Sequence, residues 1–276
     1  MTHWHNLISQ LPFEWAHYAF MQNALLAVIL LSPMFAMLGC LVVNSQMAFF
    51  SEAVGHAALT GIAIGVLVGL TQPLGAMLVF AVALALAVTG LRRSTAASVD
   101  TIIGLTMAFT VALGVVLLSR GGGFAKFTGY LVGDLLTVTP RDLGRVAVLA
   151  CLFFAVWVLF FNKIFFLVVN RSLAGSRGLP VWLLESLFAV TVALVVTASI
   201  PMAGLLVINS LLILPAATAR NVARNMFAYL WIAVAVSLVS GLTGLIVSFY
   251  WATATGATIV LLTMVFFVLS LFGRRR

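Results

Sequence analysis

Residues 47–70, MAFFSEAVGHAALTGIAIGVLVGL, combine the length of a membrane span with an ionisable pair near one end. Glu52 and His56 lie four residues apart, so a helix places their side chains one above the other on the same face. Ser51, just before Glu52, is the expected N-cap. An ionisable side chain inside a membrane segment is energetically costly and indicates function. The stretch therefore predicts a transmembrane helix with a candidate site in its first turns.

A second stripe on the same predicted helix consists of small residues at four-residue spacing. Such spacing lets the backbone of another membrane helix approach closely. We therefore expect one neighbouring helix to pack along the stripe formed by Ala57, Gly61, Gly65 and Gly69.

The composition of the 276-residue chain predicts a membrane protein along its whole length. Hydrophobic residues make up 64% of it and charged residues only 7%, far less charge than a soluble domain of this size needs. Apolar runs of roughly 18 residues or more recur from end to end. The predicted fold class is all-α, a polytopic helical membrane protein with eight or nine transmembrane elements, and residues 1–276 are expected to form a single transmembrane domain.

The segment that follows Pro201 is the least regular of the expected spans, because the proline is expected to end the preceding helix. Residues 202–216 would then form a helix of only about 22 Å, shorter than the roughly 30 Å hydrocarbon core. We expect this piece to be tilted, kinked or partly re-entrant. The full set of expected spans is 20–43, 47–70, 73–91, 100–119, 143–166, 181–200, 202–216, 227–250 and 256–272.

The basic residues, which give a net charge of +8, indicate topology rather than nucleic-acid binding. With the C-terminus in the cytoplasm, ten arginines and lysines fall in cytoplasmic segments and four outside, as the positive-inside rule requires. If residues 202–216 cross the membrane, the N-terminus lies outside. The cytoplasmic set is Arg92, Arg93, Lys163, Arg171, Arg177, Arg220, Arg224 and the arginines at 274–276, against Arg120, Lys126, Arg141 and Arg145 outside.

The reactive side chains argue against an enzyme. The only lysines, Lys126 and Lys163, do not belong to a GxxxxGK[ST] phosphate-binding loop, and no nucleophile–base set is apparent. Asp100 and Glu185 lie near expected helix starts, where compensation of the helix dipole is a sufficient explanation. Two classes remain open. One is a self-sufficient carrier or channel, and the other is a permease subunit driven by a separate ATPase.

Four blocks of sequence decide between these classes by resemblance. MAFFSEAVGHAALTGIAIG resembles the second-helix signature of metal-type ABC permeases, the membrane subunits of bacterial zinc and manganese uptake systems. Three further blocks match the family's pattern in the right order. Any one block would be weak evidence, but four in order over nearly the whole chain are specific. The other three are VDTIIGLTMAFTVALGVVLLS (99–119), GYLVGDLLTVTPRDL (129–143) and GLLVINSLLILPAATAR (204–220).

The resemblance implies a homodimeric, multi-pass permease of the bacterial cytoplasmic (inner) membrane. It also implies cytoplasmic ATPase subunits that bind ATP and an extracytoplasmic metal-binding protein. Glu52 and His56 stand where the family has an acid and a histidine, which implies that they contact the metal. Zinc accepts carboxylate oxygen and imidazole nitrogen at about 2.0–2.2 Å, so one ion can bridge an i, i+4 pair. The alternative is a Glu52–His56 hydrogen bond that only neutralises buried charge.

A segment between the predicted spans also gains an interpretation from the family. SLAGSRG (172–178) resembles the cytoplasmic segment that is expected to dock the ATPase, with Ser172 in place of the family's acid and with Leu173, Ala174 and Gly178 kept. The alternative for this segment is a basic loop that only fixes topology.

GDLLTVTP is more similar to the zinc branch than to the manganese branch, which favours Zn²⁺ over Mn²⁺ or Fe²⁺ as the substrate. Asp134 and Asp142 are expected to face outward. They are either contacts for cations or the binding protein, or ordinary surface carboxylates.

Overall fold

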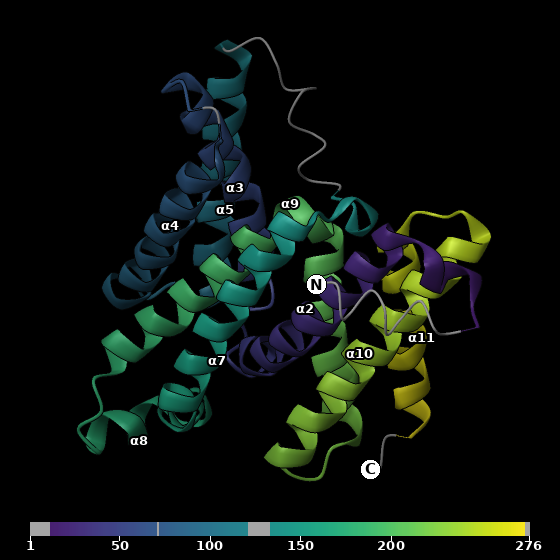
Figure 1. The fold of residues 1–276 in the computed structure, drawn as a ribbon. Coiled ribbons are helices and arrows are strands. Elements are labelled where there is room, and N and C mark those ends of the chain that lie inside the picture. Colours follow the sequence, from purple (N-terminus) through teal and green to yellow (C-terminus); the bar gives the residue numbers. More distant parts are fainter. Residues whose placement is uncertain (1–11, 71, 121–132, 274–276) are drawn as a thin grey trace. The chain divides into compact units, whose positions relative to one another are not determined.

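The computed structural model describes the chain except for residues 1–11, 71, 121–132 and 274–276, and the described part contains helices and no strand (Figure 1). Eight of these helices are long and apolar enough to cross a membrane, which confirms the predicted all-α membrane class. The spans are α2 (Ala19–Asn44), α3 (Phe50–Leu67), α4 (Leu74–Ser94), α5 (Val99–Arg120), α7 (Pro140–Val169), α9 (Val181–Val222), α10 (Met226–Trp251) and α11 (Thr255–Phe272). The shorter elements are the 3-10 helices η1 (Glu14–His17) and η2 (Leu135–Thr137) and the α-helix α8 (Arg171–Ser176).

Helix α9 differs from the prediction for this part of the chain. It runs through Pro201 and Pro215 over 42 residues, but it consists of two helical parts joined at a kink. The interruption lies at Gly204, where φ 74° and ψ 156° are non-helical. The expected helix end at Pro201 is therefore wrong. Only glycine adopts this backbone conformation easily, so it is Gly204 that allows the chain to break the helix.

The residues group into two compact units. The first consists of Met1–Cys40, Val132–Leu152 and Pro201–Arg276, and the second of Leu41–Leu131 and Phe153–Ile200. In the second unit α3 packs against both α4 and α5, and the three helices lie side by side (Figure 1). In the first unit α10 packs against α11.

Close backbone contacts hold the first unit together. Gly39 of α2 lies against the Leu212 carbonyl, and the backbone of Gly133 lies against that of Gly204. The Ser237 hydroxyl of α10 donates a hydrogen bond to the Ser32 carbonyl of α2 at 3.1 Å. Small residues at these positions let the helix backbones approach closely, as is usual in membrane proteins.

The small-residue stripe of α3 packs on α4 as predicted. A Cβ added to Gly61 would lie 2.6 Å from the Met77 Cα, and one added to Gly65 would lie 3.1 Å from the Ala76 Cβ. The prediction does not extend to Gly69, which lies beyond the end of α3 and has open space around it.

The start of α3 corrects the predicted cap. Phe49 is the N-cap, and Ser51 lies inside the first turn, with its hydroxyl 3.3 Å from the Ala48 carbonyl that accepts its hydrogen bond. The Phe50 amide already donates to the Met47 carbonyl at 2.9 Å. Because the preceding turn satisfies this amide, the helix begins before Ser51 and does not need a capping side chain.

Candidate functional site

Glu52 and His56 lie on α3 as the sequence predicts, with Glu52 in the first turn and His56 one turn further on. Both residues are partly buried, whereas Ala53, Val54 and Gly55 between them are buried. The pair therefore occupies a strip of α3 that the rest of the chain covers incompletely.

The helix neighbours of α3 explain why this strip stays open. Gly61 comes nine residues after Glu52, or two and a half turns at about 3.6 residues per turn, so it points to the opposite side of the helix. Helix α4 packs on that opposite side. Thr60, one turn beyond His56, meets α5, where its hydroxyl donates a hydrogen bond of 2.6 Å to the Thr110 carbonyl. Helix α4 thus covers the face away from Glu52 and His56, and α5 flanks the pair.

The ligand atoms of the pair are available in this structure. Among the described residues, neither Glu52 nor His56 has a hydrogen bond or ion pair, so the structure does not contain the Glu52–His56 hydrogen bond that was the alternative interpretation. Nor does any group of three His, Cys, Asp or Glu side chains suited to a metal occur in the described part of the chain. One copy therefore offers two candidate ligands here and not a complete ligand set.

The predicted ATPase-docking segment forms helix α8 between α7 and α9. The Asn170 side chain caps it by accepting a hydrogen bond of 2.9 Å from the Leu173 amide. Ala174 is fully buried, whereas Ser172 and Leu173 are exposed, Leu173 by 45%. Gly178, just after the helix, has a φ of 73° and reverses the chain toward α9. The segment is thus an exposed short helix with one buried anchor, which is suited to contact a partner.

Two arginines attach α8 to its neighbours. The Arg177 guanidinium lies over the Phe166 ring of α7, 5.0 Å from its centroid. Arg171 forms an ion pair with Glu185 of α9, with 3.0 Å between Nε and Oε1. The sequence explained Glu185 by compensation of the helix dipole. That explanation is incomplete, because it omits the ion pair with Arg171. The sequence signal was a single acid that follows a basic segment, but only the fold brings α8 and α9 together.

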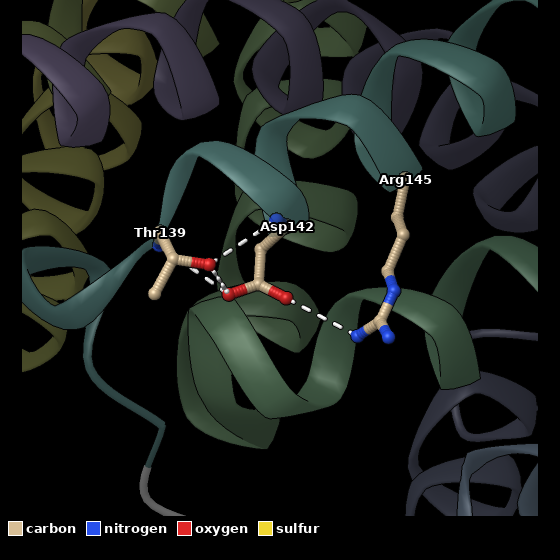
Figure 2. A network of polar contacts seen from close by, with 3 residues as sticks. All are labelled: Thr139, Asp142 and Arg145. Atoms are coloured by element: carbon tan, nitrogen blue, oxygen red, sulfur yellow. Dashed lines mark hydrogen bonds and ion pairs between the residues drawn. The ribbon is translucent and has the colours of Figure 1, made fainter.

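The two carboxylates that were expected to face outward have structural partners. Asp134 caps η2, because its Oδ1 accepts a hydrogen bond of 2.9 Å from the Leu136 amide. Figure 2 shows Asp142 at the start of α7, where its Oδ2 accepts hydrogen bonds from the Thr139 hydroxyl at 2.6 Å and the Thr139 amide at 3.3 Å. Arg145 donates to Oδ1 at 3.2 Å. Both carboxylates thus support helix starts, and an outer contact with a cation or a partner stays a prediction.

Comparison with known proteins places these features in a family. The model of the ABC 3 transport family matches residues 17–274, nearly the whole chain. The chain belongs to this family. It is therefore the membrane permease of a metal ABC transporter, a multi-pass transport subunit whose ATPase is a separate subunit. This finding confirms the resemblance drawn from the four sequence blocks and the interpretation that the chain is not an enzyme.

Three relatives of this ABC 3 permease illustrate the range within the family. It is 34% identical over 254 residues to the high-affinity zinc uptake system membrane protein ZnuB of Haemophilus influenzae, covering 92% of this chain and 97% of that protein. It is 28% identical over 257 residues to the manganese transport system membrane protein MntC of Halalkalibacterium halodurans, covering 92% and 87%. The structure of PsaBC from Streptococcus pneumoniae in complex with a Fab matches with a TM-score of 0.79 and 25% identity, covering 98% and 95%.

Proposed function

We propose that this permease belongs to an ATP-driven zinc importer of a bacterial cytoplasmic (inner) membrane and that Glu52 and His56 contact the ion in transit. The observation that carries the proposal is the acid–imidazole pair on α3, which is partly exposed and has no partner among the described residues. Charged side chains within membrane segments line cavities or protein interfaces and avoid lipid. The open strip of α3 therefore belongs to a pathway or an interface.

A second copy of the chain fits this requirement. Most membrane and soluble homo-oligomers are symmetric, so a twofold axis beside α3 would bring an identical pair to the first. Two copies would then offer four ligands, the number that zinc prefers, whereas one copy offers two and would hold the ion weakly. Weak or shared coordination suits transport, because the ion must leave the site after it has bound.

Zinc is the favoured substrate for two independent reasons. Zinc commonly binds imidazole nitrogen and carboxylate oxygen together, whereas manganese prefers oxygen ligands, and the pair offers one nitrogen donor and one oxygen donor. The relative whose name specifies zinc shares 34% identity with this chain, against 28% for the one whose name specifies manganese. Manganese and iron are the alternative substrates, and the assay below includes both.

The proposed assembly also contains two cytoplasmic ATPase subunits and an extracytoplasmic metal-binding protein. The exposed helix α8 supports the ATPase contact, because its capped start and buried Ala174 present Ser172 and Leu173 outward. ATP binding and hydrolysis in those subunits would alternate access to the path, while the permease supplies ligands and the docking surface.

Transport by the reconstituted complex tests the proposal. In proteoliposomes with the ATPase and the binding protein, we expect ATP-dependent uptake of zinc in preference to manganese and iron. Glu52→Gln and His56→Gln should each lower zinc uptake by about tenfold or more, as expected when a metal site is disturbed. Glu14→Gln and His17→Gln are matched controls, because η1 carries this exposed acid and histidine at similar spacing.

Two results would overturn different parts of the proposal. Wild-type uptake by the double variant Glu52→Gln/His56→Gln would remove the pair from the path. Zinc movement down its gradient through the chain alone, without ATPase or ATP, would favour the self-sufficient carrier instead.

A further inference from the structure

Helix α8 is too short to hold its own position. It contains six residues, whereas isolated helices below about 12–15 residues are marginal in water. Its placement must therefore come from the contacts that fix its two ends. If an ATPase pushes on α8, weak contacts at its ends would let α8 rotate by itself and leave its neighbours in place.

The contact at the start of α8 is a two-pronged ion pair. Arg171 Nε lies 3.0 Å from Glu185 Oε1, and Arg171 Nη2 donates a hydrogen bond to Glu185 Oε2 at 3.1 Å. Such a fork fixes orientation as well as distance. The Glu185 side chain is only 11% exposed and that of Arg171 is 51% exposed, so the acid is anchored within α9 and the arginine reaches it from α8.

A third charged residue lines a cavity beside this contact. Arg92, in the last turn of α4, lines a cavity of about 290 Å³ together with Arg171 and Glu185. The Arg92 guanidinium also contacts the Met47 sulfur, with Nη1 3.4 Å from Sδ. Met47 stands in the turn that leads into α3, little more than one helical turn ahead of Glu52. Glu185 thus pairs with Arg171 and shares one cavity with Arg92 and another with Arg93.

We propose that Arg171 and Glu185 are positioning residues that couple α8 to α9, so that nucleotide-driven movement of α8 reaches the metal path. The inference rests on the proposed function, because it requires the ATPase to dock at α8. The ion pair binds no metal itself. It keeps α8 and the first part of α9 moving as one body, beside the cavity that Arg92 also lines.

The test is the number of zinc ions moved per ATP hydrolysed by the reconstituted complex. Glu185→Gln keeps the shape of the side chain and removes the charge, and it should lower this ratio by about fivefold or more, the scale of a typical coupling free energy. The swapped pair Arg171→Glu/Glu185→Arg should restore much of the ratio. Arg145→Gln is the matched control, because it breaks the exposed Arg145–Asp142 ion pair and leaves the Arg171–Glu185 pair intact. The zinc concentration that gives half-maximal uptake should not change, because the Glu52–His56 pair is untouched.

The outcomes separate this inference from the proposed function. If the wild-type complex does not move zinc with ATP, the proposed function fails. If it does and Glu185→Gln retains the wild-type ratio, or lowers uptake and ATP hydrolysis in equal proportion, only the coupling role is refuted. A swapped pair no better than Glu185→Gln refutes it as well. Should Glu185→Gln not assemble, Arg171→Gln replaces it, because Arg171 is half exposed, and the same fall in the ratio is expected.

Discussion

Replacing Gly61 with alanine tests how tightly α3, the helix that carries Glu52 and His56, is seated on α4. The added methyl group would lie 2.6 Å from the Met77 Cα, whereas ordinary contacts begin at 3.4 Å, so a shift of 3.4 − 2.6 = 0.8 Å would restore an ordinary contact between α3 and α4. Overpacking of this kind costs about 1–3 kcal/mol. Alanine also gains about 0.5–1 kcal/mol over glycine within a helix, which offsets part of the penalty.

Gly90→Ala isolates the steric part of this effect. Gly90 lies within α4, and an added Cβ meets nothing within 4 Å, so this variant has the helix-propensity gain without the clash. The difference in unfolding free energy between the two variants should therefore be about 1–3 kcal/mol, with Gly61→Ala the less stable. Denaturant titration of the purified permease, followed by tryptophan fluorescence, measures it. If Gly61→Ala proves as stable as Gly90→Ala, the close packing of α3 on α4 is refuted.

Two further changes probe the parts of the fold around α7 and α9. Thr139→Ala removes the hydroxyl that accepts a hydrogen bond from the Asp142 amide at 3.3 Å and so caps the start of α7, and it should destabilise the permease by about 0.5–2 kcal/mol. Arg145→Ala removes only an exposed ion pair to Asp142 and should change stability by less than about 1 kcal/mol. Equal losses in denaturant titrations would contradict this assignment. Gly204→Ala adds a Cβ at a residue that lies against the Gly133 backbone and whose own backbone conformation is essentially reserved for glycine. It should lower the free energy of unfolding by about 1–3 kcal/mol in the same titration. An unchanged midpoint would refute this.

The sequence predicts the membrane helices well because their signal is local. Hydropathy locates each apolar run, and four-residue spacing is enough to place Glu52 above His56 and Gly61 above Gly65. Helix ends are less predictable, because nearby backbone groups decide them. Ser51 has the chemistry of an N-cap, yet the preceding turn satisfies the Phe50 amide first.

Features that depend on two distant segments escaped prediction. Pro201 is the obvious place to break α9, but the backbone breaks at Gly204, where it lies against Gly133. Glu185 has a sufficient local explanation as an acid near a helix start, and only the approach of α8 reveals Arg171 as its partner. In each case the deciding contact joins residues from different elements, which no local pattern encodes.

The two proposed sites lie within one compact unit, and this bears on how the transporter could work. The unit of Leu41–Leu131 and Phe153–Ile200 contains the Glu52–His56 pair, the docking helix α8 and the Arg171–Glu185 ion pair. Within this unit, Arg171, Glu185 and Arg92 line one cavity, and Arg92 contacts Met47 in the turn that leads into α3, so the proposed coupling needs no contact outside the unit. The non-helical backbone at Gly204 lies just beyond this unit, in the second part of α9. There the Gly204 backbone lies against that of Gly133, so the second part of α9 has its own packing partner within the first unit.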